Sequence, residues 1–186
     1  MAARITFISA LLLCSILVSC GSLPYECTDL MGCIEISTGS PILIASILAT
    51  KGDNAPIGDA TLKGIEQAIE EQRKISDHPI ELLNYGTDCT AENARSAALE
   101  LATNPELVAV IGPTCEEEVA VVSPIMDSAG IILLTPSSSE QAYSLTYQLM
   151  TAIEQLSART SDNTLYVPRQ ALRDDLVPPP SWAVPP

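Results

Sequence analysis

The sequence has little basic charge. Nine Lys and Arg stand against 23 Asp and Glu, which gives a formal net charge of −14 over 186 residues. Nucleic-acid binding requires clustered Lys and Arg on one face of a protein. The charge balance therefore excludes nucleic acid as a partner, and it fits an exported domain whose surface acidity keeps it in solution.

Residue patterns for catalysis and metal binding are also missing. The single histidine, His78, precedes a proline in a predicted loop, and one histidine excludes most Ser-His and Cys-His arrangements. Cys115 in Gly-Pro-Thr-Cys has no evident base, and no Gly-rich phosphate loop follows a predicted strand. No cysteine pair has the C-x-x-C spacing of a zinc site. We expect no enzyme activity, no metal and no cofactor.

The N-terminus carries a short apolar run, Ile8–Val18, after the basic Arg4. A run of this length that ends at a small residue predicts a secretory signal over residues 1–19. The following Leu-Val-Ser-Cys-Gly resembles a bacterial lipoprotein signal, in which Cys20 becomes the acylated first residue. An ordinary signal with an incidental cysteine is the alternative. The lipoprotein interpretation predicts a chain held by acyl chains at the outer face of the bacterial cell membrane or in the periplasm.

An even number of cysteines remains after the predicted signal and the lipidated cysteine. With residues 1–19 removed and Cys20 acylated, Cys27, Cys33, Cys89 and Cys115 remain, and an oxidising compartment predicts two disulfides among them. Sequence alone allows three connectivities. Cys27 and Cys33 close an easy small loop. Cys89 and Cys115 each follow a predicted strand, and we expect those strands to be parallel neighbours whose ends are within disulfide reach.

The stretch 108–139 organises the predicted fold. Leu107–Ile111 and Ile131–Thr135 are apolar without alternation, as in parallel strands that are buried on both faces. The residues between them suffice for a crossover helix, so the loops after both strands fall at one edge of a parallel sheet, where open α/β sheets bind ligands. The sequence predicts a small-molecule site there.

The preceding residues continue the alternation of strand and helix. It predicts a three-layer, doubly wound parallel α/β sheet. Pro124 predicts a kink or break in the third helix. Residues 20–40 are predicted to form a leader that is closed by its own disulfide, and the Pro-rich residues 177–186 are predicted to form an extended tail. The predicted strands are Pro41–Ala49 and Ile80–Tyr85 besides the two above, and the predicted helices are Gly58–Lys74, Ala91–Thr103, Glu116–Ser128 and Glu140–Ser157.

Several motifs resemble those of a known family. The chain is similar to the periplasmic-binding-protein type I superfamily, and within it to the leucine/isoleucine/valine-binding proteins of branched-chain amino acid ABC transporters. The resemblance is continuous from about Leu17 to Ser139, and it favours a Cys89–Cys115 bridge. It rests on the lipoprotein start, Glu26–Ile36, Ile57–Asp59, His78–Leu82, Val-Ile-Gly-Pro-Thr-Cys, and Ser-Pro-Ile-Met-Asp-Ser-Ala-Gly-Ile-Ile-Leu-Leu-Thr-Pro-Ser-Ser-Ser.

The resemblance also implies that part of the family pattern is missing. Such proteins have two lobes that close on the ligand. Residues 41–158 correspond to lobe one and residues 159–176 to a remnant of the C-terminal part, in which Pro168 suits the start of a helical turn. Most of lobe two is then absent, with the join near Ser139 and Glu140. A natural deletion, a gene-model artefact and a degenerate paralogue would each produce this pattern.

The resemblance implies a ligand set at the two loops. Ser139 would offer a hydroxyl to an amino acid's carboxylate, Ser137 its carbonyl to the ammonium group, and Glu116 stands where the family supplies a hydroxyl and an amide. Ile57 stands where an aromatic contact is frequent. Glu116 is either an ordinary first-turn acid, or a sign of preference for a cationic or amide ligand or of lost binding. The implied function is a solute-binding lipoprotein that serves an ABC transporter permease, with poor affinity. The alternative is a receptor-like or scaffolding lipoprotein that uses the lobe as an interaction module.

Overall fold

The computed structural model describes residues 25–177. The predicted signal 1–19, Cys20 and tail residues 178–186 lie outside the described residues. The main sheet has five strands in the order β3 (Lys74–Ile75), β4 (His78–Gly86), β2 (Ile42–Leu48), β5 (Leu107–Ile111), β6 (Ile132–Leu134). β4, β2, β5 and β6 are parallel, whereas β3 joins β4 as an antiparallel hairpin.

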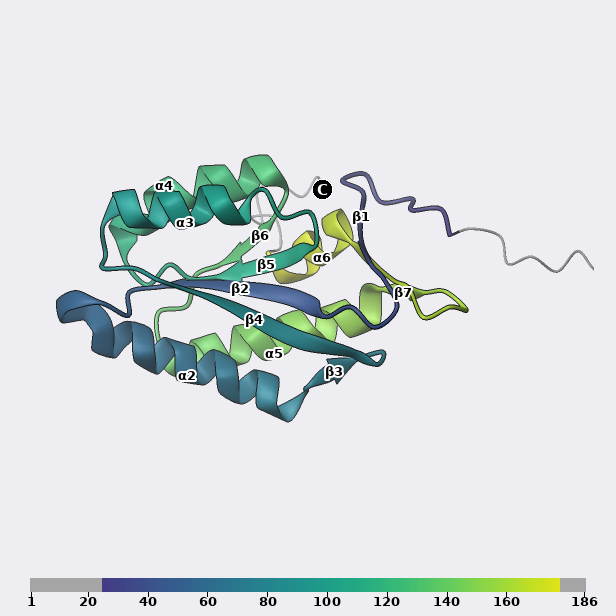
Figure 1. The fold of residues 1–186 in the computed structure, drawn as a ribbon, viewed down its shortest axis with the longest axis horizontal. Helices are drawn as coiled ribbons and strands as arrows, with labels where there is room; N and C mark the ends of the chain where they lie inside the picture. The colour runs from purple at the N-terminus through teal and green to yellow at the C-terminus, as the bar shows by residue number, and fades with distance from the viewer. Residues whose placement is uncertain (1–24, 178–186) are drawn as a thin grey trace, which may run out of the picture.

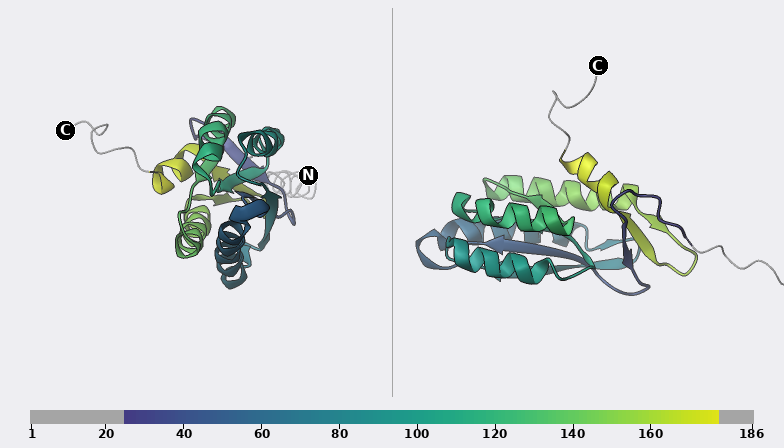
Figure 2. Two further views of the ribbon diagram at one scale, coloured as in Figure 1. Left: turned by 90° about the vertical axis from the view of Figure 1, so that its left-hand side faces the viewer. Right: turned by 90° about the horizontal axis from the view of Figure 1, so that it is seen from above.

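Helices cover both faces of this sheet. α2 (Ala55–Glu71) and α5 (Ser139–Leu156) lie side by side on one face, and α3 (Ala91–Leu101) and α4 (Glu116–Ala129) lie on the other (Figures 1 and 2). Neighbouring residues of β2 alternate between the two layers, since Ile44 packs in the cluster with α2 and α5 while Ala45 packs in the cluster with α3 and α4. The predicted three-layer, doubly wound α/β lobe is confirmed.

Pro124 does not break the third helix, so a break, one of the two predicted outcomes, is wrong. α4 runs unbroken from Glu116 to Ala129 and includes Pro124. Proline at this position removes the hydrogen bond to the carbonyl of Ala120, four residues earlier. Both Ala120 and Pro124 are exposed, so water can satisfy that carbonyl and the helix continues.

The predicted leader and remnant form a second sheet that the sequence analysis missed. β1 (Cys33–Ile36) pairs antiparallel with β8 (Leu165–Pro168), and β8 pairs with β7 (Ala158–Arg159). Ile34 and Ile36 are each 2% exposed and belong to the same cluster as α2 and α5. The leader therefore contributes a core strand, and only the second half of the remnant is helical, in α6 (Arg169–Leu176).

The location predicted for His78 is also wrong. The residue begins β4 after a two-residue turn at Ser76 and Asp77, both with positive φ, as tight hairpin turns require. Its side chain is fully buried. Nδ1 lies 2.9 Å from the carbonyl oxygen of Ser40, and Nε2 lies 2.8 Å from that of Asn163. His78 thus joins the main sheet to the chain after β1 and to the loop between β7 and β8.

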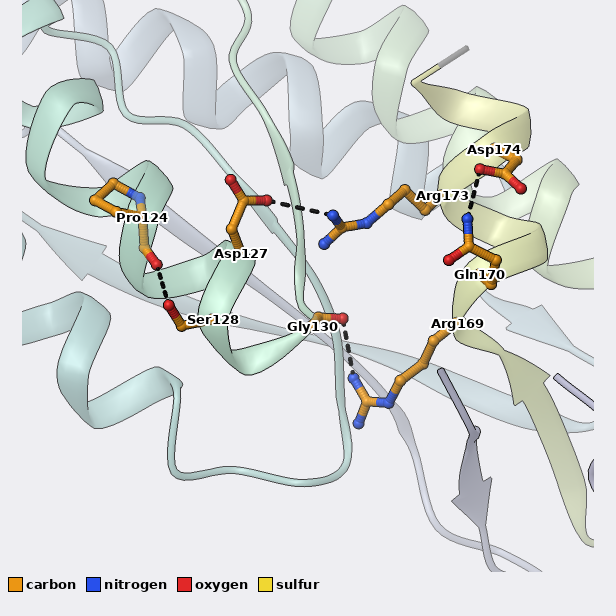
Figure 3. A network of polar contacts seen from close by, with 8 residues as sticks. All are labelled: Pro124, Asp127, Ser128, Gly130, Arg169, Gln170, Arg173 and Asp174. Atoms are coloured by element: carbon orange, nitrogen blue, oxygen red, sulfur yellow. Dashed lines mark hydrogen bonds and ion pairs between the residues drawn. The ribbon is translucent and has the colours of Figure 1, made fainter. Parts of the chain in front are cut away.

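Polar contacts hold α6 against α4 (Figure 3). The half-buried Arg169 donates to the carbonyl oxygens of Gly130 at 3.3 Å and Pro105 at 3.0 Å. Arg173 forms an ion pair of 3.4 Å with Asp127. Arg169 thus meets the carbonyl group of Gly130, the C-cap residue of α4, where positive charge is favourable.

Asp29 caps α6 from the opposite end of the sequence. Its carboxylate accepts from the N–H groups of Gln170 at 3.0 Å, Ala171 at 3.1 Å and Met31 at 2.9 Å. Burial acts to raise the pKa of Asp29, but these three donors outweigh it and lower the pKa below the ordinary value. The contact therefore stabilises the fold at pH values above the ordinary pKa range of a carboxyl group. This stabilisation is lost as the pH falls through the lowered pKa of Asp29.

Asp29→Ala is expected to lower the free energy of unfolding by roughly 1–2 kcal/mol at pH 6, the usual cost of a lost helix cap. The difference from the wild type should shrink below about pH 4, because the unfolded wild-type chain then binds a proton at Asp29 that the folded chain resists binding. Urea unfolding at pH 6 and pH 3 measures both values. The exposed Asp175→Ala serves as control and should stay within about 0.5 kcal/mol at pH 6. An undiminished difference at pH 3 would contradict this account of the cap.

Candidate functional site

The two loops singled out in the sequence share one edge of the sheet. β5 and β6 are parallel neighbours, so residues 112–115 and 135–138 both follow carboxyl ends at that edge. The loop after β2 contributes a 3₁₀ turn, Gly52–Asn54, and the loop after β4 contributes residues 87–90. This is the edge at which open α/β sheets place ligands.

Acidic residues begin α4 at this edge. Glu116 and Glu117 are exposed, and Cys115 is the N-cap residue. Carboxylates in a first helical turn interact favourably with the helix dipole, which accounts for their presence without a ligand. They also make the rim of the candidate site negative, so an anionic ligand group would be repelled there.

The serine loop after β6 makes its hydrogen bonds within the chain. The N–H and the hydroxyl of Ser137 both donate to Oε1 of Gln141 at 2.7 Å. The Ser138 hydroxyl accepts from the Gln141 N–H at 3.2 Å and caps α5. The sequence analysis missed Gln141, although Ser138 followed three residues later by glutamine is a capping-box pattern that could have revealed it.

Glu140 adds a carboxylate to the same turn. Its own N–H, and then the hydroxyls of Ser138 and Ser139, lower the pKa of Glu140. The hydroxyl predicted to meet a ligand's carboxylate therefore already faces a carboxylate of the chain. A ligand carboxylate would have to displace it.

Ser139 also lines a hollow of about 380 Å³ between α2 and α5. Lys63, Gln67 and Tyr143 contribute polar atoms to it, and α2 approaches closely because Gly64 has no side chain beside the Ser139 carbonyl. Another hollow, of about 240 Å³, lies between α4, β6 and α6. Glu116 and Ile57 line neither of these two hollows.

Ile57 lies in the first turn of α2, just after the loop that follows β2. Its side chain is 55% exposed, and its carbonyl accepts from the Thr61 hydroxyl at 2.9 Å. The topology thus brings Ile57, Glu116, Ser137 and Ser139 to one edge of the sheet. Among the described residues, no hydrogen bond or ion pair joins Glu116 to either serine.

The structure contains the Cys27–Cys33 and Cys89–Cys115 disulfides. The geometric reason predicted for the second one is wrong, since β2 lies between β4 and β5. The loop after β2 spans the gap. Thr114 Oγ1 accepts from the N–H of Ala49 at 3.0 Å, and the N–H of Lys51 donates to the Thr87 carbonyl at 2.9 Å. The Cα atoms of Cys89 and Cys115 are 5.6 Å apart.

A buried carboxyl group lies beside this disulfide. Glu118 is 0% exposed, and within residues 25–177 neither of its oxygens makes a well-formed hydrogen bond; the hydroxyl of the buried Thr87 makes none there either. Burial, and to a smaller extent the Asp88 charge, raise the pKa of Glu118. The Thr87 hydroxyl and the Cys89 N–H lower the pKa, but the net shift is upward. Thr87 and Cys89 are therefore near enough to act on the carboxyl group without hydrogen-bonding it fully.

Neither metal binding nor membrane crossing finds support in the described part of the chain. Within residues 25–177, no group of three or more His, Cys, Asp or Glu side chains could hold a metal ion. Within the same residues, no helix is long and apolar enough to span a bilayer.

A parallel sheet covered by helices on both faces, with four loops at one edge, defines a doubly wound α/β lobe. The family described as "Receptor family ligand binding region" matches residues 62–165, more than half of the chain. The chain belongs to this family, and the predicted membership of the periplasmic-binding-protein type I superfamily is confirmed.

The relatives are solute-binding proteins. An amino acid binding protein of Pseudomonas aeruginosa is 31% identical over 91 residues, covering 47% of this chain and 24% of that protein. The Leu/Ile/Val-binding protein of Escherichia coli K12 is 26% identical over 118 residues, covering 59% of this chain and 32% of that protein. The chain thus spans about a quarter to a third of the length of these curated relatives.

Solved structures of such proteins also match. A leucine-binding protein from Thermotoga maritima has 26% identity and a TM-score of 0.49, covering 52% of this chain and 28% of that one. A branched-chain amino acid transporter substrate-binding protein from Streptococcus pneumoniae, in complex with isoleucine, has 27% identity and a TM-score of 0.49, covering 53% and 29%.

Proposed function

We propose that this lobe binds a small amino-acid-like molecule as part of a solute-binding protein of a branched-chain amino acid type ABC transporter. The observation that carries the proposal is the placement of the loops after β5 and β6 at one edge of the sheet. The family match supports it. In this proposal Cys20 holds the exported chain at the membrane, and the transporter permease is the protein partner.

The ligand class follows from the charges at the rim. Glu116, Glu117 and Glu140 face the edge with carboxylates, so a ligand that presents an ammonium or amide group is favoured over one that presents only a carboxylate. Ser137 and Ser139 supply the hydroxyl and carbonyl contacts, and Ile57 supplies an apolar one. Affinity is low for this lobe by itself, because an open edge leaves about half of a ligand in water whereas good pockets bury most of it.

Ser139→Ala is expected to weaken binding at least fivefold, because the loss of one hydrogen bond costs about 1 kcal/mol. Calorimetry of the full chain against leucine, isoleucine, leucinamide and agmatine measures binding and ranks the ligand groups. The matched control is Ser144→Ala, which lies on the same helix and accepts only from Gln148. Equal loss in both variants, or no saturable binding by a folded wild type, would overturn the proposed site.

A further inference from the structure

We propose that the Cys89–Cys115 disulfide is a thiol–disulfide exchange site that reacts with small thiols, and with cationic thiols in preference to anionic ones. Cys115 is the N-cap residue of α4, a 14-residue helix, and its side chain makes no capping hydrogen bond. Unpaired N–H groups at a helix N-terminus stabilise a thiolate. Cys115 is therefore the better leaving group of the pair.

The second observation is the unpaired carboxyl group of Glu118. It lies in the same first turn, is 0% exposed, and is directed at residues 87–89, which lead into Cys89. Its two oxygens and the Thr87 hydroxyl all lack partners. Buried polar groups without partners are rare and point to a chemical role or a bound species. Burial makes this carboxyl group bind its proton more tightly than an exposed one does. When protonated, it can supply that proton to a thiolate departing from the same helical turn.

If Cys115 departs, the attacked sulfur is that of Cys89. Cys89 is half-exposed, as Cys115 is, and its φ of 65° places a non-glycine residue in the left-handed region. The Asn54 side-chain amide donates to Sγ of Cys89 at 3.1 Å, and it would stabilise the Cys89 thiolate that the second step releases. The Cys27–Cys33 disulfide offers an internal comparison, since neither of its cysteines caps a helix.

The exchange balances with two thiols. A thiolate attacks Sγ of Cys89, the protein S–S bond breaks, and its electron pair leaves on Sγ of Cys115, which takes a proton from Glu118. A second thiolate attacks the external sulfur of the mixed disulfide, giving the small-molecule disulfide and releasing the Cys89 thiolate. Solvent returns protons to Cys89 and Glu118, so two thiols are oxidised while one protein disulfide is reduced.

The preference for cationic thiols follows from the surrounding charges. In the loops at residues 50–54, 87–90 and 112–117, the ammonium of Lys51 stands against the carboxylates of Asp53, Asp88, Glu116 and Glu117. This excess attracts cysteamine and repels thioglycolate. A difference of roughly tenfold in rate at equal thiolate concentration is expected at low ionic strength, and salt should reduce it.

The decisive measurement compares the two disulfides in one molecule. The full chain is incubated with cysteamine or thioglycolate, alkylated at intervals, and analysed by mass spectrometry of the cysteine peptides. Cys89–Cys115 is expected to open at least tenfold faster than Cys27–Cys33 with cysteamine, with the thiol attached to Cys89 and the alkyl group on Cys115. Equal rates, attachment to Cys115, or faster reaction with thioglycolate would overturn the proposal.

Glu118→Gln tests the proton donor while keeping the shape of the side chain. It is expected to slow opening of Cys89–Cys115 at least fivefold and to flatten the dependence of the rate on pH. Glu117→Gln, the exposed neighbour, should leave the shape of that pH profile unchanged. An unaltered profile in Glu118→Gln would remove the carboxyl group from the mechanism. The wild-type comparison stands whether or not this variant folds.

Discussion

Gly112→Ala is expected to lower the free energy of unfolding by roughly 3 kcal/mol or more. Gly112 has a φ of +113°, which L-residues rarely adopt, and an added Cβ would overlap the backbone carbonyl of Ile47. Backbone cannot move aside as a flexible side chain can, so strain and overpacking add. Urea unfolding followed by circular dichroism measures the loss.

Gly39→Ala separates these two costs. Gly39 also has a positive φ, of +79°, but nothing lies within 4 Å of an added Cβ. Only the conformational cost remains, about 1–2 kcal/mol. If the two variants lose the same stability, the close approach of β2 to the loop after β5 is not what requires glycine at position 112.

Ile34→Ala is expected to cost roughly 2–4 kcal/mol, the usual range for truncating a fully buried aliphatic side chain. Ile34 is 2% exposed in β1 and packs in the main core although it precedes the first strand of the main sheet. A leader held only by its own disulfide would lose almost nothing on this substitution. The midpoint and slope of urea unfolding measure the effect.

Glu35→Ala is the matched control. Glu35 is the next residue of β1 and is exposed, so its removal should change stability by no more than about 0.5 kcal/mol. Comparable losses in Ile34→Ala and Glu35→Ala would place β1 outside the core.

The main sheet could be predicted because its signals are local. β2 and β5 are largely apolar runs, and each helix shows an apolar face at helical spacing. Periodicity and turn residues therefore locate each element within a few residues. The small sheet could not be predicted in the same way. The four residues of β1 carry a weak alternation, and their partners in β8 lie about 130 residues further along the chain.

The candidate site was predictable in position and less so in detail. The carboxyl edge follows from parallel order alone, which places Glu116, Ser137 and Ser139 together. The contacts of Gln141 with Ser137 and the burial of Glu118 depend on how side chains turn within a helix's first turn. Spacing in the sequence leaves that choice open. The order of β4, β2 and β5 likewise depends on crossover geometry, which hydrophobicity does not encode.

The antiparallel pairing of Cys33 with Pro168 sets an order for folding during synthesis. A chain that emerges from its N-terminus presents β1 long before β8 exists, so Ile34 and Ile36 have no strand partner until nearly the whole lobe has been made. Folding from the N-terminus must then finish with the pairing of β1 and β8, and contacts between residues so far apart in the sequence form slowly. Until that step, the unpaired β1 is the segment that chaperones and proteases would meet.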